Sequence, residues 1–167
     1  LLDDLGVERG TVVPDRKPLH MAALIRDRLA AIAYRFDRKG QQVIVQVHGP
    51  DRVMGDERIL GGIVDALLSN ASKFSEKGQE IQLAIRNHGT HMEVLVTDHG
   101  EGLSAADLAQ VFVRYAMLAS RPTQGEAQGR GTLARMHAWA QAHGGALVAS
   151  SPGVGAGCTF RLRIPVT

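Results

Sequence analysis

Two side chains that could bind a charged ligand lie close together near the middle of the sequence. Asn70 and Lys73 belong to the stretch 56–75, in which apolar residues recur at intervals of three and four. Such spacing is typical of an amphipathic helix with one face on a core. Asn70 falls at the border of that face, where an amide oxygen can bind a hard cation and Lys73 can neutralise an anion. The alternative is that Asn70 is only a hydrogen-bonded helix residue and Lys73 an exposed one.

Asp98 is the second candidate for ligand binding. It follows an alternating segment and has the same parity as the apolar residues Met92, Val94 and Val96. Residues of one parity face the same side of a strand, so we expect this carboxylate to point toward the core. A carboxylate in apolar surroundings needs a hydrogen-bond donor, and the exocyclic amino group of a base is one. The alternative is that Asp98 only begins a turn.

Two groups of glycines in the sequence are candidates for contacts with the same ligand. Gly100 and Gly102 follow Asp98 and let the backbone approach a flat ligand closely. Gly129, Gly131 and Thr132 lead into an apolar-periodic segment, and backbone N–H groups at a helix start bind phosphates. The latter glycines are equally well explained as loop residues. Together, the three regions supply the parts that a nucleotide site needs.

The periodicity predicts the elements that would position these residues. We expect strands in the alternating segments and helices where the spacing is three and four, with Asp56 capping the central helix. Segment 114–130 has little apolar periodicity and is expected to be a loop. These elements predict an α+β fold, a two-layer sandwich whose mixed, mostly antiparallel sheet carries three main helices on one face. The expected helices are 21–36, 56–75, 105–113 and 132–143, and the strands are 41–48, 81–85, 92–96, 146–150 and 158–164.

Composition limits the classes of function. A chain of 167 residues with 44% hydrophobic residues forms one globular domain. A net charge of +2 gives no field strong enough to favour a nucleic-acid partner or contact with a membrane. The single cysteine, Cys158, excludes an internal disulfide and is expected to be a small buried residue.

In their order and spacing, these segments resemble the catalytic ATP-binding domain of two-component sensor histidine kinases. That family belongs to the wider group of gyrase, Hsp90 and MutL, whose common architecture is the Bergerat fold. The resemblance extends from residue 19 to residue 165. It rests on an N box at 67–75, a first glycine box at 98–103, an F box at 111–115, a second glycine box at 129–134, His-Gly-Gly at 143–145 and Pro165.

The resemblance implies a role for each candidate residue. Asn70 would ligate Mg²⁺, Lys73 would contact a phosphate of ATP and Asp98 would bind adenine. Gly100 and Gly102 would shape the base pocket, and 114–131 would form a lid over ATP. Residues 1–10 would end a preceding dimerisation helix, and 11–167 would form the ATP-binding domain. The phosphate-binding loop would contain Gly129, Gly131 and Thr132.

The reaction implied is transfer of the γ-phosphoryl group of ATP to a histidine on a separate dimerisation domain, and then to an aspartate of a response regulator. The acceptor histidine would therefore lie outside this chain. The implied partners are the kinase's own dimerisation domain and a receiver domain, with a homodimer in the full-length protein. The implied location is the cytoplasm, either free or as the cytoplasmic part of a membrane-bound sensor.

Three departures from the family pattern support an alternative. Ala66 stands where kinases have Asn and where related ATPases have Glu. The second glycine box is one residue short, with Thr132 at the last glycine position, and Cys158 replaces a hydroxyl residue. These features favour a domain that keeps the fold and acts as a docking module with weak or no ATP turnover. A third hypothesis, an ATPase of the gyrase type, is disfavoured because position 66 lacks Glu.

Overall fold

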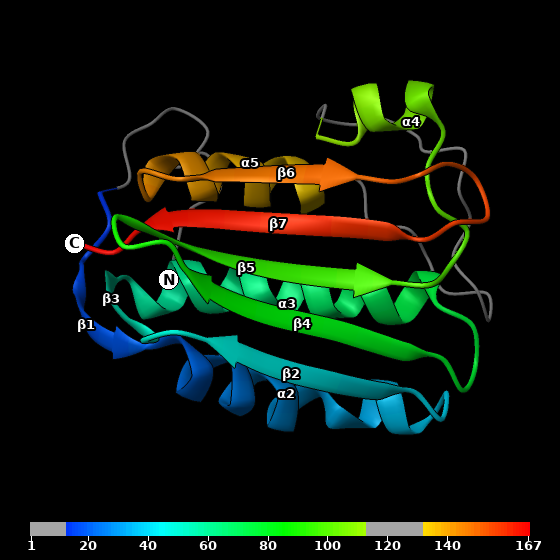
Figure 1. Cartoon of the computed structure of the whole chain (residues 1–167), viewed down its shortest axis with the longest axis horizontal. Coiled ribbons are helices and arrows are strands. Elements are labelled where there is room, and N and C mark those ends of the chain that lie inside the picture. Colours follow the sequence, from blue (N-terminus) through cyan, green and yellow to red (C-terminus); the bar gives the residue numbers. More distant parts are fainter. Residues whose placement is uncertain (1–12, 113–131) are drawn as a thin grey trace.

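The computed structural model describes residues 13–112 and 132–167 (Figure 1). The longer helices and strands lie where the periodicity predicts them. The elements are β1 (Lys17–His20), α2 (Met21–Asp37), β2 (Gln42–His48), β3 (Arg52–Gly55), α3 (Glu57–Phe74), β4 (Glu80–Asn87), β5 (His91–Asp98), α4 (Ala105–Gln110), α5 (Thr132–Ala142), β6 (Ala146–Ser150) and β7 (Cys158–Pro165).

Five strands form one sheet in the order β2-β4-β5-β7-β6. The pair β2–β4 is parallel, with Val43 opposite Ile81, and the other three pairs are antiparallel. The prediction of a mixed, mostly antiparallel sheet is therefore confirmed. In β5 the buried and half-buried residues alternate, so one face of the strand is turned to the core and the other is not.

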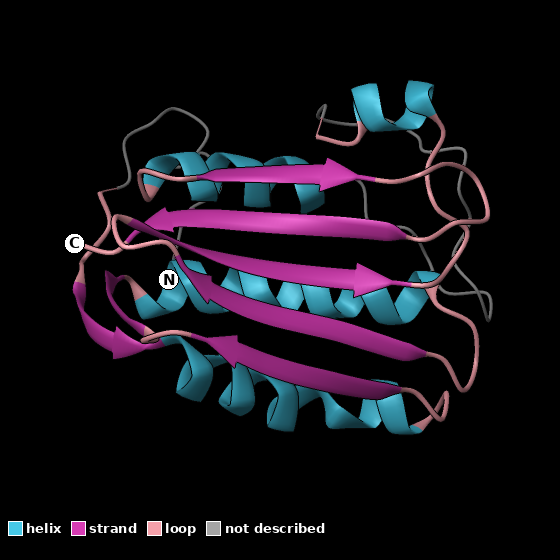
Figure 2. Cartoon of the chain, viewed as in Figure 1, coloured by secondary structure: helices cyan, strands magenta, loops and turns pink. Residues whose placement is uncertain are grey.

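The three long helices α2, α3 and α5 form a second layer behind the sheet (Figure 2). α3 lies in the middle of this layer, because it packs against α2 on one side, α5 on the other and β5 in front. On its apolar face Ile59, Ile63 and Leu67 are fully buried. The predicted two-layer sandwich is thus confirmed, with the helix that carries Asn70 at its centre.

Three short elements differ, at least in part, from the expectation. The sequence of residues 11–18, with Pro14 and Pro18, predicts an edge strand or linker, and no strand is predicted at Arg52–Gly55. The structure pairs β1 with β3 in a separate two-stranded sheet, in which Lys17 lies opposite Gly55. Four residues are too few to show an alternating pattern. α4 ends at Gln110, earlier than expected, although its cap is regular, because the Asp107 N–H donates to the Ser104 hydroxyl.

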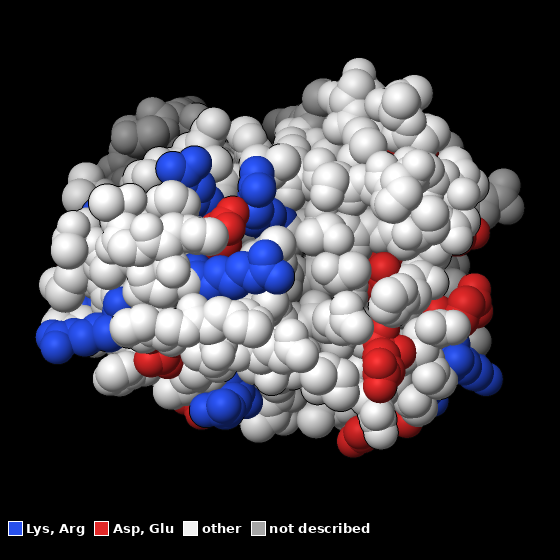
Figure 3. All heavy atoms as spheres, viewed as in Figure 1, with Lys and Arg blue, Asp and Glu red and all other residues white. Residues whose placement is uncertain are grey.

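Charges of both signs share the face of the sheet that is turned away from the helices. Most Lys and Arg side chains gather on the left of the view in Figure 3, and most Asp and Glu side chains on the right. Where the signs meet they pair, as between Arg161 Nε and Glu93 Oε2 at 3.2 Å. No helix among residues 13–112 and 132–167 is both long and apolar enough to span a bilayer.

The N-terminus of α3 is held by a buried polar cluster. Asp56 caps the helix as predicted, with its Oδ1 accepting from the N–H groups of Arg58 and Ile59 at 3.0 and 3.4 Å. Its Oδ2 accepts from the Asp15 N–H at 2.9 Å, and its own N–H donates to His143 Nε2 at 3.0 Å. Burial lowers the pKa of His143, and the Arg16 guanidinium acts in the same direction, so the imidazole stays neutral and can accept.

We predict that Asp56→Ala lowers the free energy of unfolding by about 1–2 kcal/mol at pH 7, the usual cost of losing an N-cap. Burial opposes ionisation of Asp56, but hydrogen bonds from Asp15, Ile59 and Arg58 outweigh it and lower its pKa. Because the pKa of Asp56 is lower in the folded state, its carboxylate stabilises the fold at any pH above 3.8, the pKa in the unfolded state. This stability is lost as the pH falls through the pKa of the folded state. Urea unfolding should therefore show that the free energies of unfolding of wild type and variant differ less at low pH than at pH 7. An equally large difference at low pH would contradict this account.

Candidate nucleotide site

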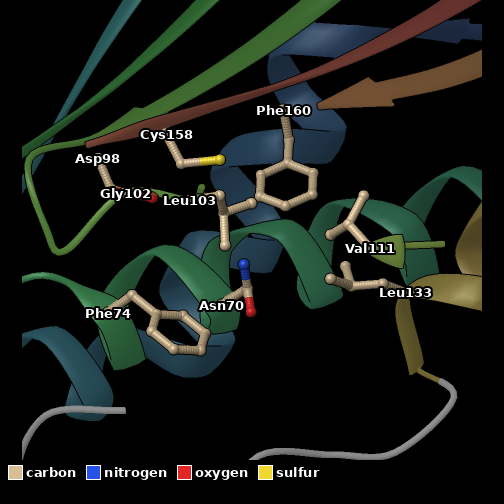
Figure 4. A pocket seen from close by; sticks show the side chains of 9 residues that line it. All are labelled: Asn70, Phe74, Asp98, Gly102, Leu103, Val111, Leu133, Cys158 and Phe160. Atoms are coloured by element: carbon tan, nitrogen blue, oxygen red, sulfur yellow. The ribbon is translucent and has the colours of Figure 1, made fainter. Parts of the chain in front are cut away.

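A cleft opens between the C-terminal half of α3 and the ends of β5 and β7 (Figure 4). About 310 Å³ of space in and above the cleft is free of protein atoms, and this space includes open solvent. Most of its lining is apolar, with one amide and one carboxylate. The lining residues are Asn70, Phe74, Asp98, Gly102, Leu103, Val111, Leu133, Cys158 and Phe160.

Asp98 provides the buried acceptor of this cleft. The residue is 3% exposed, as its parity on β5 predicted. Its Oδ1 accepts from the Gly100 N–H at 3.0 Å. Burial raises the pKa of Asp98, while hydrogen bonds from the Gly100 and Cys158 N–H groups and the nearby His99 partly oppose the rise. An acceptor in such surroundings gains from a further hydrogen-bond donor on a ligand.

Gly100 and Gly102 are glycines for two different reasons. A side chain on Gly100 would overlap the Phe74 carbonyl oxygen, so this residue holds the loop after β5 against the end of α3. Gly102 has φ +71°, and a side chain there would overlap the Gly153 carbonyl oxygen. Only Gly102 lines the cleft directly; Gly100 acts through the backbone contact with Phe74.

The remaining predicted site residues are brought together only in part. Asn70 is half-buried and lines the cleft on the α3 side, across from β5 and β7 (Figure 4). Lys73 is half-buried in the last turn of α3 but is not one of the lining residues. Thr132 begins α5, and its neighbour Leu133 reaches the cleft. Gly129 and Gly131, together with the expected lid at 114–131, lie outside the described residues.

Position 66 offers no polar group to the cleft, and its neighbour does not replace one. Ala66 is partly buried and packs against the core. Asp65 turns toward α2, where its Oδ2 lies 3.4 Å from Arg28 Nη1. Burial raises the pKa of Asp65, against the opposing charges of Arg28 and Arg35. This carboxylate therefore belongs to the α2–α3 contact and cannot act as a base in the cleft.

The apolar walls of the cleft were not predicted as site residues. Phe74 comes from α3, Leu103 from the loop after β5, Val111 from the end of α4, and Phe160 from β7. Three of these residues lie inside motifs of the resemblance, because the N box contains Phe74, the first glycine box contains Leu103 and the F box begins at Val111. Only Phe160 has no such signal and reads as a core position of its strand, because the fold alone brings it to the cleft.

Cys158 is a buried residue in the cleft, as expected. Burial raises the pKa of the Cys158 thiol to about 12 from 9.0, and the nearby Asp98 carboxylate acts in the same direction. We predict that iodoacetamide modifies this thiol roughly a thousand-fold more slowly in the folded chain than in concentrated urea, because the thiolate is the reactive species. Mass spectrometry of timed samples at pH 8 measures both rates. Equal rates would show that the thiol is exposed.

The described residues fit a nucleotide. A flat base matches the apolar walls, and Asp98 can accept a hydrogen bond from its edge. Among residues 13–112 and 132–167, no three His, Cys, Asp or Glu side chains come together to hold a metal ion. A Mg²⁺ ion near Asn70 would therefore need phosphate oxygens and water for most of its ligands, which is the usual arrangement for this ion.

Comparison with known proteins decides the family. A family model described as "Histidine kinase-, DNA gyrase B-, and HSP90-like ATPase" matches residues 55–167. The chain belongs to this ATPase family. The matched span includes α3, the Asp98 loop and every residue that lines the cleft. The family is named for ATPases, which supports nucleotide binding by this domain.

Named relatives narrow the resemblance to histidine kinases. The sensor-like histidine kinase SenX3 of Mycolicibacterium smegmatis is 30% identical over 165 residues, which is 96% of this chain but 41% of SenX3. The mycobacterial sensor histidine kinase MprB has a solved structure with a TM-score of 0.78 and 28% identity, covering 89% of this chain and 97% of that one. The recognition of the kinase-type catalytic ATP-binding domain is therefore confirmed.

A third comparison supports the fold. The histidine kinase ThkA, in complex with the response regulator protein TrrA, matches with a TM-score of 0.77 and 16% identity, covering 92% of this chain and 42% of that one. At this identity the likeness shows the shared architecture alone. The chain spans 41% of the length of SenX3.

Proposed function

We propose that the chain is the ATP-binding half of a sensor histidine kinase, and that it presents the γ-phosphoryl group of ATP to a histidine on a separate domain. The observation that carries this proposal is the buried Asp98 carboxylate, which opens into an apolar cleft opposite Asn70. A kinase that only positions ATP needs no nucleophile or base of its own in this domain.

Asp98 would select adenine over guanine. Its carboxylate accepts hydrogen bonds, and adenine carries an amino group at the position where guanine carries a carbonyl oxygen. Guanine would thus place an acceptor against an acceptor. Phe74, Leu103 and Phe160 would cover the faces and edges of the base. Asn70 would contribute its amide oxygen to Mg²⁺, and Lys73 would face the phosphates.

In this proposal, the partners follow from the reaction. The phosphoryl group would go first to a histidine on the kinase's own dimerisation domain and then to a receiver domain of a response regulator. The complex of ThkA with TrrA concerns that kinase, and it supports a partner of the same kind for this chain. Homodimerisation through the dimerisation domain and a cytoplasmic location remain parts of the proposal.

The direct test is calorimetric titration of the chain with ATP and with GTP, each with and without Mg²⁺. We expect ATP to bind, Mg²⁺ to strengthen the binding and GTP to bind much more weakly. Failure of ATP to bind at millimolar concentration would reject a nucleotide function. Incubation of the full-length protein with labelled ATP then shows whether a histidine is phosphorylated.

A second function is favoured by one observation. Ala66 leaves position 66 without a polar group, and Asp65 points away toward Arg28. A domain of this kind could bind ATP and dock partners with little turnover. Binding of ATP without labelling of a histidine in the full-length protein would favour this docking module over the kinase.

A further inference from the structure

A buried polar cluster lies outside the cleft, where α2 leads into β2. Lys39 is 3% exposed and Gln41 is 5% exposed. Long polar side chains are rarely buried to this degree unless their polar atoms are paired. The partners of both are backbone carbonyl groups at the C-terminal end of α3, more than thirty residues away in the sequence.

The contacts are dense. Lys39 Nζ donates to the carbonyl oxygens of Ser72 and Lys73 at 2.7 and 3.4 Å. Gln41 Nε2 shares its hydrogens among the carbonyl oxygens of Ser72, Ser75 and Glu76 at 3.1, 3.0 and 3.3 Å. The Ser72 hydroxyl returns a hydrogen bond of 2.7 Å to Gln41 Oε1. The last carbonyls of a helix lack partners within it, so this cluster completes the end of α3.

The same end of α3 forms one wall of the nucleotide site. Asn70 and Phe74 line the cleft. The Phe74 carbonyl oxygen lies so close to Gly100 that no side chain would fit between them. Gly100 in turn donates its N–H to Asp98 Oδ1. A continuous series of contacts therefore leads from Lys39 and Gln41, through the last turn of α3, to the carboxylate in the cleft.

We propose that Lys39 and Gln41 are positioning residues for the nucleotide site, because they fix the last turn of α3 and through it the Asp98 loop. Neither side chain lines the cleft, so neither contacts a nucleotide there. A lysine at the carbonyl end of a helix also complements the helix dipole and opposes a shift of that end. This inference rests on the proposed function where ATP affinity is the measurement, and is independent of it where the apo protein is measured.

The test uses Lys39→Met, Gln41→Leu and the milder Ser72→Ala, which removes only the hydroxyl bonded to Gln41. We expect ATP affinity to fall about ten-fold in the first two and less in the third, because small displacements of positioning groups have large effects. We also expect the Gly100 amide resonance of the nucleotide-free protein to shift, since its hydrogen bond to Asp98 reports the position of the loop.

Two controls separate positioning from stability. Lys77→Met changes an exposed lysine that follows the same helix. Ile85→Val removes a methylene group from the core of β4, outside the cluster and the cleft, and lowers the melting temperature without touching a polar contact. Both controls should keep the wild-type ATP affinity and the wild-type Gly100 resonance.

The outcomes are distinct. Lower melting temperatures of the cluster variants, with unchanged ATP affinity and an unmoved Gly100 resonance, would overturn the proposal and leave the cluster a purely stabilising role. If the wild-type chain binds no ATP, the proposed function fails. The Gly100 resonance still decides the inference in that case, because it is recorded without nucleotide. Should Lys39→Met fail to fold, Ser72→Ala gives the same two measurements.

Discussion

Replacement of Asp98 by asparagine is expected to weaken ATP binding by about 10- to 150-fold while the fold is kept. The loss corresponds to one hydrogen bond to a charged acceptor, worth about 1.5–3 kcal/mol. Asparagine has nearly the same shape, but its amide can turn an N–H group toward the amino group of adenine. Two donors would then face each other. Calorimetric titration with ATP and Mg²⁺ measures the effect.

The matched control is Glu101→Gln, an exposed carboxylate three residues further along the same loop. This variant should bind ATP as the wild type does, so a general loss of negative charge can be told apart from loss of the buried acceptor. Equal weakening in both variants, or wild-type affinity in Asp98→Asn, would contradict the role of Asp98 in binding the base.

The pH dependence of stability gives Asp98→Asn an independent check. Burial raises the pKa of Asp98, so the folded state holds this proton more tightly than the unfolded state. The stabilising contribution of the protonated carboxyl is complete at any pH below 3.8, the pKa of the unfolded state. It is lost as the pH rises through the higher pKa of the folded state. Urea unfolding should therefore show that the variant gains stability relative to the wild type across this interval.

Replacement of Asn70 by alanine is expected to remove the effect of Mg²⁺ on ATP affinity and to lower the rate of histidine phosphorylation by at least about 100-fold in the full-length protein. Among the described residues that line the cleft, Asn70 has the one amide oxygen, while the Asp98 carboxylate is assigned to the base. Phosphoryl transfer depends on a correctly placed metal. Titrations with and without Mg²⁺, followed by labelling with ATP, measure the two effects separately.

The neighbouring residue Ser69 provides the control. It is half-buried on the same turn of α3 but is not one of the lining residues. Ser69→Ala should retain both the Mg²⁺ effect and the labelling rate. If Asn70→Ala still binds ATP more tightly with Mg²⁺ than without, the metal is held by other groups and the assignment of Asn70 is wrong.

Local sequence patterns were enough to predict features that depend on a single helix or a single strand. The spacing of apolar residues located α3, and Asp56 was correctly placed as its cap. Parity along β5 was enough to predict that Asp98 is buried. Each of these inferences needs only the geometry of one helix or one strand, which is why they could be made before the fold was known.

Features built from several distant segments could not be predicted in this way. Nothing in the sequence singles out Lys39, or Gln41 at the start of the strand expected at 41–48, because their carbonyl partners are more than thirty residues away. Leu133 and Phe160 read as core residues of separate elements, although the fold brings both to the cleft. At position 66 the sequence alone shows that a polar group is missing, because the residue is Ala66. It does not show that the neighbouring Asp65 carboxylate is paired with Arg28.

The polar clusters around Asp56 and around Gln41 hold the two opposite ends of α3. Its 18 residues span about 27 Å at the rise of an α-helix. One end is bonded to Asp15 through Asp56, and the other to Gln41, the residue before the edge strand β2. Both ends of α3 are therefore fixed by hydrogen bonds from neighbouring segments, and Asn70 lies between the two fixed points.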